Sequence, residues 1–114
     1  MPEHTACVDA LLIRFYVSRM EFHWDPKKAK SNLRKHQVSF EEAVSVFSDI
    51  LSFTYNDEAH SQAERRYATL GISVRGRVLV VVHTMRGEQL RIINAREATP
   101  RERRWYEKET KQKK

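Results

Sequence analysis

Apolar and β-branched residues gather in two runs in the second half of the chain. One leads from Val78 to Arg86 and the other from Leu90 to Arg96, with Gly87-Glu88 between them. Runs of this density are typical of strands at the centre of a sheet with at least one face covered. The break between them predicts a hairpin that turns at Arg86-Gly87 or at Gly87-Glu88.

The pattern near residue 20 predicts a strand followed by a helix. Residues 20–24 combine apolar and polar positions as a short strand does. Asp25 then supplies an N-cap and Pro26 occupies the first helical position, so a helix is expected to about Gln37.

Ser39 to Glu42 has the form of a capping box, in which Ser39 caps a second helix and Glu42 reaches back to the cap. Apolar residues at helical spacing extend this helix to near Asp49. Strands are expected at 51–55 and 64–74, with a polar loop between them.

A second capping box, Thr99 to Glu102, begins a terminal helix with proline at its first position. The predicted order is therefore β-α-α-β-β-β-β-α. Because the helices and most of the strands fall in separate runs, the fold class is α+β. We expect a mostly antiparallel twisted sheet, two N-terminal helices and a C-terminal helix.

Positive charge is concentrated at the C-terminal end. The 114 residues carry a formal net charge of +6, and residues 101–114 hold seven Lys or Arg against three Glu. The preceding residues are almost balanced, so bulk electrostatics favour a polyanionic partner weakly and mainly through the C-terminal segment.

Chain length and cysteine content limit the number of domains and the classes of protein that this chain can belong to. The chain is long enough for one domain, which we place at 20–111, with 1–19 as a helical or disordered extension and 112–114 as a basic tail. Residues 1–19 lack the pattern of a signal peptide or membrane span. The lone Cys7 cannot form an internal disulfide, no Cys/His spacing resembles a metal site, and no cofactor is expected. A reducing cytoplasm is the expected compartment, away from membranes.

Three arginines interrupt the apolar hairpin: Arg86, Arg91 and Arg96. Arginine stays charged at any relevant pH, so its burial is costly unless an anion or carboxylate lies nearby. The hairpin thus indicates a pocket for negative charge, or else arginines that pair with structural carboxylates or reach water at strand ends.

Strand alternation sorts these residues between two faces. With a two-residue turn, Thr84 and Arg86 share a face with Arg91, Ile93 and Ala95. The second face then holds a set that includes one histidine: His83, Leu90, Ile92, Asn94 and Arg96. Either face could be the open one, and a bulge would change the pairing.

Several segments between Met20 and Glu107 together resemble the BrnT family of bacterial toxins. No segment is diagnostic alone, but they occur in the family's order, and Asn94 is the one departure, since serine is expected there. The segments are Phe22–Lys27, Asn32–His36, Val38–Ala43, Glu64-x-Arg66 with Gly71, Val82-His83-Thr84-x-Arg86, Arg91–Arg96 and Glu102 to Tyr106.

The resemblance implies a RelE-like fold and a ribonuclease toxin of a type II toxin–antitoxin pair. Its partners would be an RNA substrate (mRNA) and a BrnA-like antitoxin, with which it would form a hetero-oligomer. Toxins of this family cleave RNA without a metal, through attack of the ribose 2′-OH on the adjacent phosphate. Such an attack needs a base, cations for the phosphorane and an acid for the leaving oxygen.

The candidate catalytic residues are Arg86 and Arg91 as a phosphate clamp, Tyr106 from the terminal helix, His83 as base or acid, and Arg96. Each has a structural alternative. His83 facing the core would be an ordinary buried histidine, Arg96 could form a salt bridge at a strand end, and Tyr106 could simply pack beside Trp105.

The candidate RNA-binding residues are Lys35, His36, Arg66 and Arg103. Lys35 and His36 lie near the end of a basic helix, and the default interpretation of this helix is a solvated face. The two residues could instead bind RNA or complement the helix dipole. Arg66 could instead pair with Glu64 across strands. A different function also remains open, namely a non-catalytic module that binds nucleic acid or protein through the same basic surface.

Overall fold

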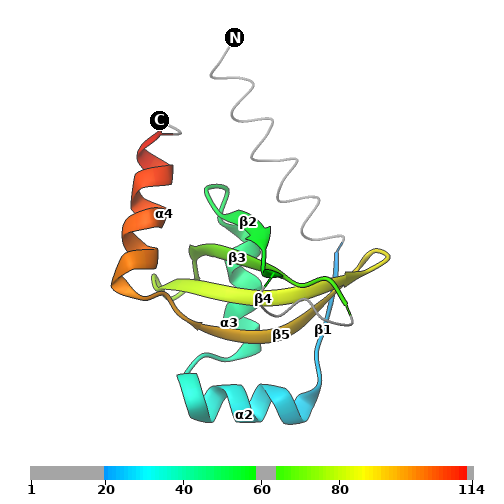
Figure 1. The fold of residues 1–114 in the computed structure, drawn as a ribbon. Helices are drawn as coiled ribbons and strands as arrows, with labels where there is room; N and C mark the ends of the chain where they lie inside the picture. The colour runs from blue at the N-terminus through cyan, green and yellow to red at the C-terminus, as the bar shows by residue number, and fades with distance from the viewer. Residues whose placement is uncertain (1–19, 59–63, 113–114) are drawn as a thin grey trace.

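A five-stranded sheet forms the framework of the protein in the computed structural model, which describes residues 20–58 and 64–112 (Figure 1). The predicted α+β class and order of elements are confirmed. The expected extension at 1–19 and the last two residues of the expected tail lie outside the described residues. The elements are β1 (Glu21–His23), α2 (Pro26–His36), α3 (Phe40–Ser45), a 3-10 turn η1 (Val46–Ser48), β2 (Phe53–Asn56), β3 (Tyr67–Ile72), β4 (Val78–Arg86), β5 (Gln89–Glu97) and α4 (Pro100–Gln112).

The strands lie in the order β1-β5-β4-β3-β2. Strands β2 to β5 form antiparallel pairs between neighbours, and β1 pairs in parallel with the first residues of β5. The β4–β5 hairpin turns through Gly87-Glu88, because Arg86 pairs with Gln89 and Gly87 has a φ of +66°. A left-handed φ of this kind suits glycine, which has no Cβ to clash.

A β-bulge changes the faces that strand alternation predicts for β5. His83 pairs with Ile92, but Val82 pairs with Asn94, so Ile93 is the extra residue. Beyond the bulge, Asn94 and Arg96 share a face with Arg91, while Ala95 lies on the face of His83. The predicted placement of Asn94, Arg96 and Ala95 was therefore wrong, since the bulge shifts the alternation by one residue.

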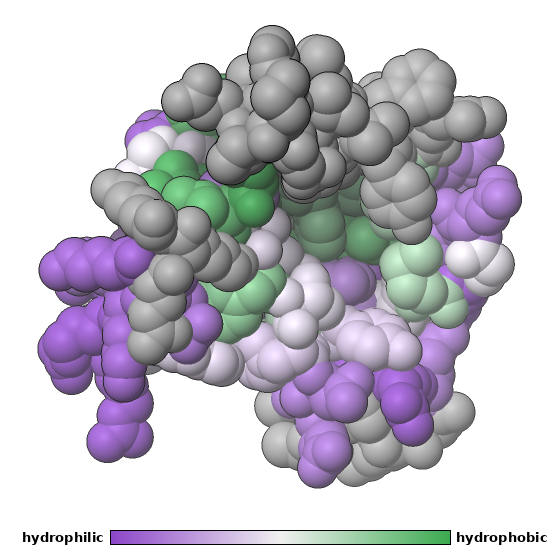
Figure 2. All heavy atoms as spheres, turned by 90° about the horizontal axis from the view of Figure 1, so that it is seen from above, coloured by the Kyte–Doolittle hydropathy of each residue, from purple (hydrophilic) through white to green (hydrophobic). Residues whose placement is uncertain are grey.

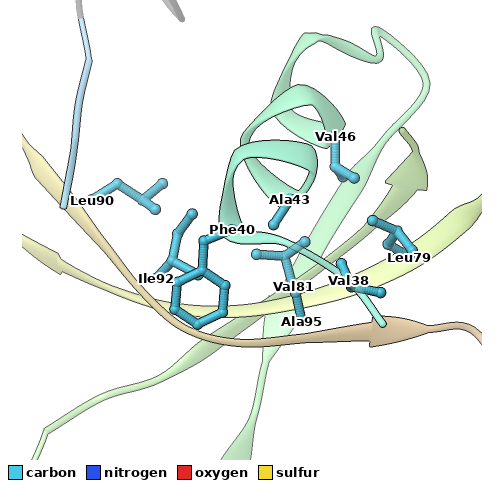
Figure 3. Close-up of a cluster of buried hydrophobic side chains, with 9 residues drawn as sticks. All are labelled: Val38, Phe40, Ala43, Val46, Leu79, Val81, Leu90, Ile92 and Ala95. Atoms are coloured by element: carbon cyan, nitrogen blue, oxygen red, sulfur yellow. The ribbon is translucent and has the colours of Figure 1, made fainter. Parts of the chain in front are cut away.

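One face of the sheet, called here the helix face, is covered by α2 and α3. Its core holds Val38, Phe40, Ala43 and Val46 against sheet residues such as Val81, all buried. Figure 3 shows Phe40, Ala43 and Val46 pointing from α3 and the following turn toward the strands. Trp24 packs edge-on against Phe40, at 5.9 Å between ring centroids, so it lies partly buried against this core.

The opposite face, called here the open face, is covered at one end by α4, which rises from the end of β5 (Figure 1). Tyr106 packs there with Leu70, Val80 and Ala98, and its hydroxyl donates to Asp49 Oδ2 at 2.5 Å. The rest of the open face is left uncovered by the described helices.

The helices begin at the capping residues that the sequence predicts, with one difference at Glu42. Lys27 donates its backbone N–H to Asp25 Oδ1 at 2.8 Å, and the second capping box is reciprocal, with Thr99 and Glu102 each accepting from the other. Ser39 Oγ accepts from the Glu42 backbone N–H at 3.0 Å. The Glu42 carboxylate, however, does not reach back. It accepts hydrogen bonds from Ser73 and Arg77 instead, so that the buried charge gains a cation and three donor groups in all.

The edge of β5 that β1 leaves unpaired is completed by a side chain of α2. Asn32 accepts from the Ala95 backbone N–H at 3.1 Å and donates to the Ala95 carbonyl at 2.8 Å. Its amide thus replaces a neighbouring strand and fixes α2 against β5. Within the described residues, no helix is long and apolar enough to cross a membrane.

Candidate functional site

A cleft of about 470 Å³ opens on the open face beside α4. It is built from residues of α2, β2, β3, β4 and β5 and of the loops between them. Its lining residues are His36, Tyr55, Asp57, Arg66, Ala68, Val80, Val82, Ile93, Asn94 and Arg96. Three sequence predictions, His36, Arg66 and Arg96, therefore meet in one place although they are far apart in the chain.

Local structure explains why these three side chains converge. His36 is the last residue of α2, which Asn32 holds against β5. Arg66 immediately precedes β3, and its carbonyl accepts from the Asp57 backbone N–H at 2.9 Å, which closes the end of the β2–β3 pair. Arg96 faces the cleft because of the bulge at Ile93.

Arg96 is held in place by a carboxylate of α4. Its Nη1 and Nη2 donate to Glu102 Oε1 and Oε2 at 2.7 and 3.0 Å, and Nη1 also donates to the Glu97 carbonyl. These bonds raise the pKa of Arg96 and, despite partial burial, lower that of Glu102. They leave Nε–H and one Nη2–H, the side edge of the guanidinium, without a hydrogen bond to any described residue. That edge suits two oxygens of an anion.

The salt bridge that was the structural alternative for Arg96 is thus present, but it leaves part of the guanidinium able to bind an anion. The geometry is that of a fixed, preorganised cation at the rim of a cleft. Thr99 shares Glu102 through the cap of α4, so the same carboxylate begins the helix and orients the arginine.

Tyr55, Asp57 and Asn94 complete the polar rim and were not predicted. All three are half-buried. Burial, assisted by the charges of Glu102 and Asp57, raises the pKa of Tyr55 although Arg96 opposes this shift, so the phenol stays protonated and able to donate. The signal available for Tyr55 was the alternation along β2 just before a polar loop, whereas the position of Asn94 depends on the bulge.

A second hollow, of about 510 Å³, adjoins this cleft. It shares His36 and Arg96 with the cleft and adds Lys35, which is exposed at the end of α2. Arg77 lies on its other side, paired with Glu97 at 2.9 Å and with the buried Glu42. Lys35 and His36 therefore both line this hollow, and His36 also lines the cleft.

The two arginines of the predicted phosphate clamp lie further along the same face, toward the hairpin turn. Arg86 pairs with Glu64, at 3.1 Å from Nε to Oε2, and both side chains are well exposed. The Arg91 side chain makes no hydrogen bond or ion pair with another described residue. Arg91 pairs across the strands with Thr84 and is half-buried. Both cations can thus reach an anion that lies along the sheet.

Two predicted catalytic residues are buried away from this surface. His83 is on the helix face, 3 % exposed, with Nε2 at 2.8 Å from Thr69 Oγ1 and with Phe47 and Tyr67 against its ring. Tyr106 is 4 % exposed and donates to Asp49, and it packs with Val80 of β4, the strand whose far end carries Arg86. His83 is thus a buried histidine with one bonded ring nitrogen, since Nδ1 has no partner among the described residues. Tyr106 packs on Leu70 and Val80, and neither side chain lies beside Arg86 and Arg91.

The remaining predicted residue, Arg103, lies exposed on α4. Chemically, the cleft combines two guanidinium groups with an imidazole, a phenol and a carboxylate. Such a set can bind a phosphodiester and exchange protons with it. Among the described residues, no group of three or more His, Cys, Asp or Glu could hold a metal ion.

Comparison with known proteins identifies the family. A family model described as the ribonuclease toxin, BrnT, of a type II toxin–antitoxin system matches residues 24–102. The chain belongs to the BrnT family. The match includes His36, Arg66 and Arg96, so the three convergent residues of the cleft all lie within the BrnT domain. Membership makes this protein a ribonuclease toxin whose partners are RNA and an antitoxin.

A solved member of the BrnT family has a similar fold. The crystal structure of the ribonuclease toxin BrnT from Brucella abortus superposes with a TM-score of 0.51 at 22 % sequence identity, covering 70 % of this chain and 97 % of that one. The similarity confirms the α+β architecture. No curated protein sequence matches the chain.

Proposed function

We propose that this BrnT-family toxin cleaves messenger RNA in the cytoplasm without a metal ion, through attack of a ribose 2′-OH on the adjacent phosphate. The observation that carries the proposal is the convergence of His36, Arg66 and Arg96 in one cleft. Arginines supply, as fixed groups, the positive charge that a metal would otherwise bring to the phosphorane.

In this proposal each rim residue has a separate task. The free edge of Arg96 and the guanidinium of Arg66 bind the non-bridging phosphate oxygens. His36 takes or returns a proton, since histidine is the side chain type that does so near neutral pH. Tyr55 supports the proposal as a second proton donor at the same rim.

Arg86 and Arg91 extend the site along the open face. A single-stranded RNA carries one phosphate per nucleotide, so cations beyond the cleft are available to neighbouring phosphates. We assign Arg86 and Arg91 to these flanking contacts, with Lys35 on the other side of the cleft. His83 and Tyr106 have no role in this mechanism because substrate cannot reach them.

The antitoxin that neutralises the toxin is proposed to be BrnA-like and acidic where it meets α4. Exposed basic residues cover this helix, and Figure 2 shows hydrophilic side chains projecting on the side where α4 lies. A stable complex would bury at least about 1,200 Å² in total. The basic residues are Arg101, Arg103, Arg104, Lys108 and Lys111.

The first prediction concerns the metal. Purified protein should cleave RNA at sub-stoichiometric amounts in EDTA and leave a 2′,3′-cyclic phosphate, because the attacking hydroxyl belongs to the substrate. Loss of cleavage on chelation with recovery in Mg²⁺ would contradict the mechanism. A protein that shifts RNA on a gel without turnover would instead be the non-catalytic binding module.

The second prediction concerns the cleft. His36→Gln and Arg66→Gln should each lower kcat by about a hundredfold or more, the scale of losing one proton-transfer group or one preorganised donor. Lys28→Gln, on the exposed part of α2, is the matched control and should keep the wild-type rate. Full activity in folded His36→Gln and Arg66→Gln variants would move the reaction elsewhere.

A further inference from the structure

The floor of the cleft differs chemically from its rim. Ala68 and Val80 are buried there, while Val82 and Ile93 are half-exposed. Phosphate and ribose are polar and gain nothing from an apolar floor. A nucleobase has flat faces that stack on apolar surface and a polar edge that needs hydrogen bonds, so it matches a cleft with this division.

Asn94 supplies groups for such an edge. The bulge at Ile93 brings Asn94 to the open face, where it is half-buried and pairs across the strands with Val82. Its side-chain amide makes no hydrogen bond with any described residue. The buried Asn32 differs, because its side-chain amide makes three hydrogen bonds to the backbone groups of Val38 and Ala95. Asn94 therefore holds a donor and an acceptor side by side that the fold does not use.

The spacing along β5 relates this amide to the phosphate site. Asn94 and Arg96 are two residues apart on the same face, a separation of roughly 7 Å along a strand. This length is comparable to the distance between phosphate and base within one nucleotide. A nucleotide can thus place its phosphate at Arg96 and its base beside Asn94.

We propose that the cleft is a nucleobase subsite, in which the base lies on Val82 and Ile93 and its edge is read by the amide of Asn94. The proposal rests on the proposed function, and adds to it a residue that determines which RNA sequences are cut. An asparagine amide pairs with a base that offers a donor next to an acceptor, and adenine is the best match.

The cleavage test compares preferences between bases. The wild-type protein and the variants Asn94→Ala and Asn94→Ser are given four RNA oligonucleotides that differ only in the base at the cleavage site. Wild type should prefer adenine, and both variants should lower the ratio between the best and the worst base by about tenfold, the effect of one bidentate base contact. Asn56→Ser is the matched control, because Asn56 is exposed on β2 at a position that faces the other side of the sheet. It should keep the wild-type ratio.

Two outcomes of this test overturn the subsite. One is a wild-type protein that cleaves RNA with no preference between bases, and the other is an unchanged ratio in both Asn94 variants. Cleavage itself remains in either case, so the proposed function would stand while the subsite fell.

A binding test separates the subsite from catalysis. Wild-type protein is titrated with a 2′-deoxy dinucleotide, which cannot undergo the attack, and with its abasic analogue, while the side-chain amide resonances of Asn94 are followed by NMR. The resonances should shift with the dinucleotide and remain in place with the abasic analogue. Equal shifts with both compounds, or none with either, would overturn the subsite. A base-dependent shift in a protein that never cleaves RNA would uphold it and reject the proposed function.

Discussion

His83 illustrates how a residue suited to catalysis can serve the fold instead. It lies under Phe47 and Tyr67, with one ring nitrogen bonded to Thr69. No cation or carboxylate is within hydrogen-bond reach of it among the described residues. Desolvation lowers the pKa of His83 from 6.5 to about 4, because the buried site disfavours the charged form. The imidazole is neutral at physiological pH and contributes packing and one hydrogen bond.

A pH-dependent stability follows from this shift. Between pH 6.5 and pH 4 the unfolded chain binds a proton that folded His83 does not, so the free energy of unfolding should fall as the pH falls through this window. The loss should reach about 3 kcal/mol. Urea unfolding near both ends of the window measures it. His83→Gln should flatten the dependence, whereas exposed His23→Gln should not, and equal slopes in the two variants would contradict the assignment.

Among the elements, α3 is tied to the turn between β3 and β4 by one carboxylate. Glu42 is 5 % exposed and accepts from Ser73 at 2.7 Å and from two nitrogens of Arg77. Burial would raise the pKa of Glu42, but the hydrogen bonds and charges of Arg77 and Ser73 outweigh it and lower the pKa. The carboxylate is therefore ionised and fixes the position of the helix against the sheet.

Glu42→Gln should lower the free energy of unfolding by about 3 kcal/mol, since it leaves the partly buried Arg77 short of its counter-charge. Denaturant unfolding above pH 6 gives the value, expressed as a shift in midpoint at constant slope. Glu41→Gln, next to it on the exposed side of α3, is the control. Identical midpoints for both variants would show that the Glu42 contact adds nothing to stability.

The order of the elements and the starts of the helices could be read from sequence because the signals are local. Asp25, Ser39 and Thr99 each cap a helix within three residues of themselves, and Gly87 marks the hairpin turn.

The ends were less predictable: the helix expected to near Asp49 is α-helical only to Ser45 and then forms a 3-10 turn, and the strand expected at 64–74 is shorter, at Tyr67–Ile72. The bulge at Ile93 could not be read from local signals. The residues of β5 have the same apolar and β-branched character with or without a bulge, so only the pairing with β4 reveals it.

The candidate site was predictable to the extent that it depends on single residue types. His36, Arg66 and Arg96 stand out as basic residues in ordered motifs, and the structure brings them together. The distant partners could not be predicted, because the pairing of Arg96 with Glu102 and the burial of Tyr106 depend on how α4 packs on the sheet.

At the scale of the whole molecule, the positive charge on α4 is expected to steer encounter with the acidic antitoxin proposed above. Charges at the rim of an interface steer association and are screened by salt, while buried contacts set the lifetime of the complex. Arg103→Glu and Lys108→Glu should therefore slow association with the antitoxin and weaken its salt dependence without abolishing the complex.

Stopped-flow mixing at low and high salt measures both effects. Lys28→Glu on α2 makes the same charge change at a different surface and serves as the control. Unchanged association rates for the α4 variants at low salt would show that the antitoxin docks elsewhere.

The Glu102 carboxylate accepts hydrogen bonds both from Thr99, at the cap of α4, and from Arg96. The start of α4 and the orientation of the Arg96 guanidinium therefore depend on the same side chain. A partner that tilts or unwinds the first turn of α4 withdraws the carboxylate that orients the Arg96 guanidinium. The cation would then lose its fixed direction although nothing had entered the cleft. If the cleft is the site of cleavage as proposed, an antitoxin bound only at the start of α4 would be expected to weaken activity without entering the cleft.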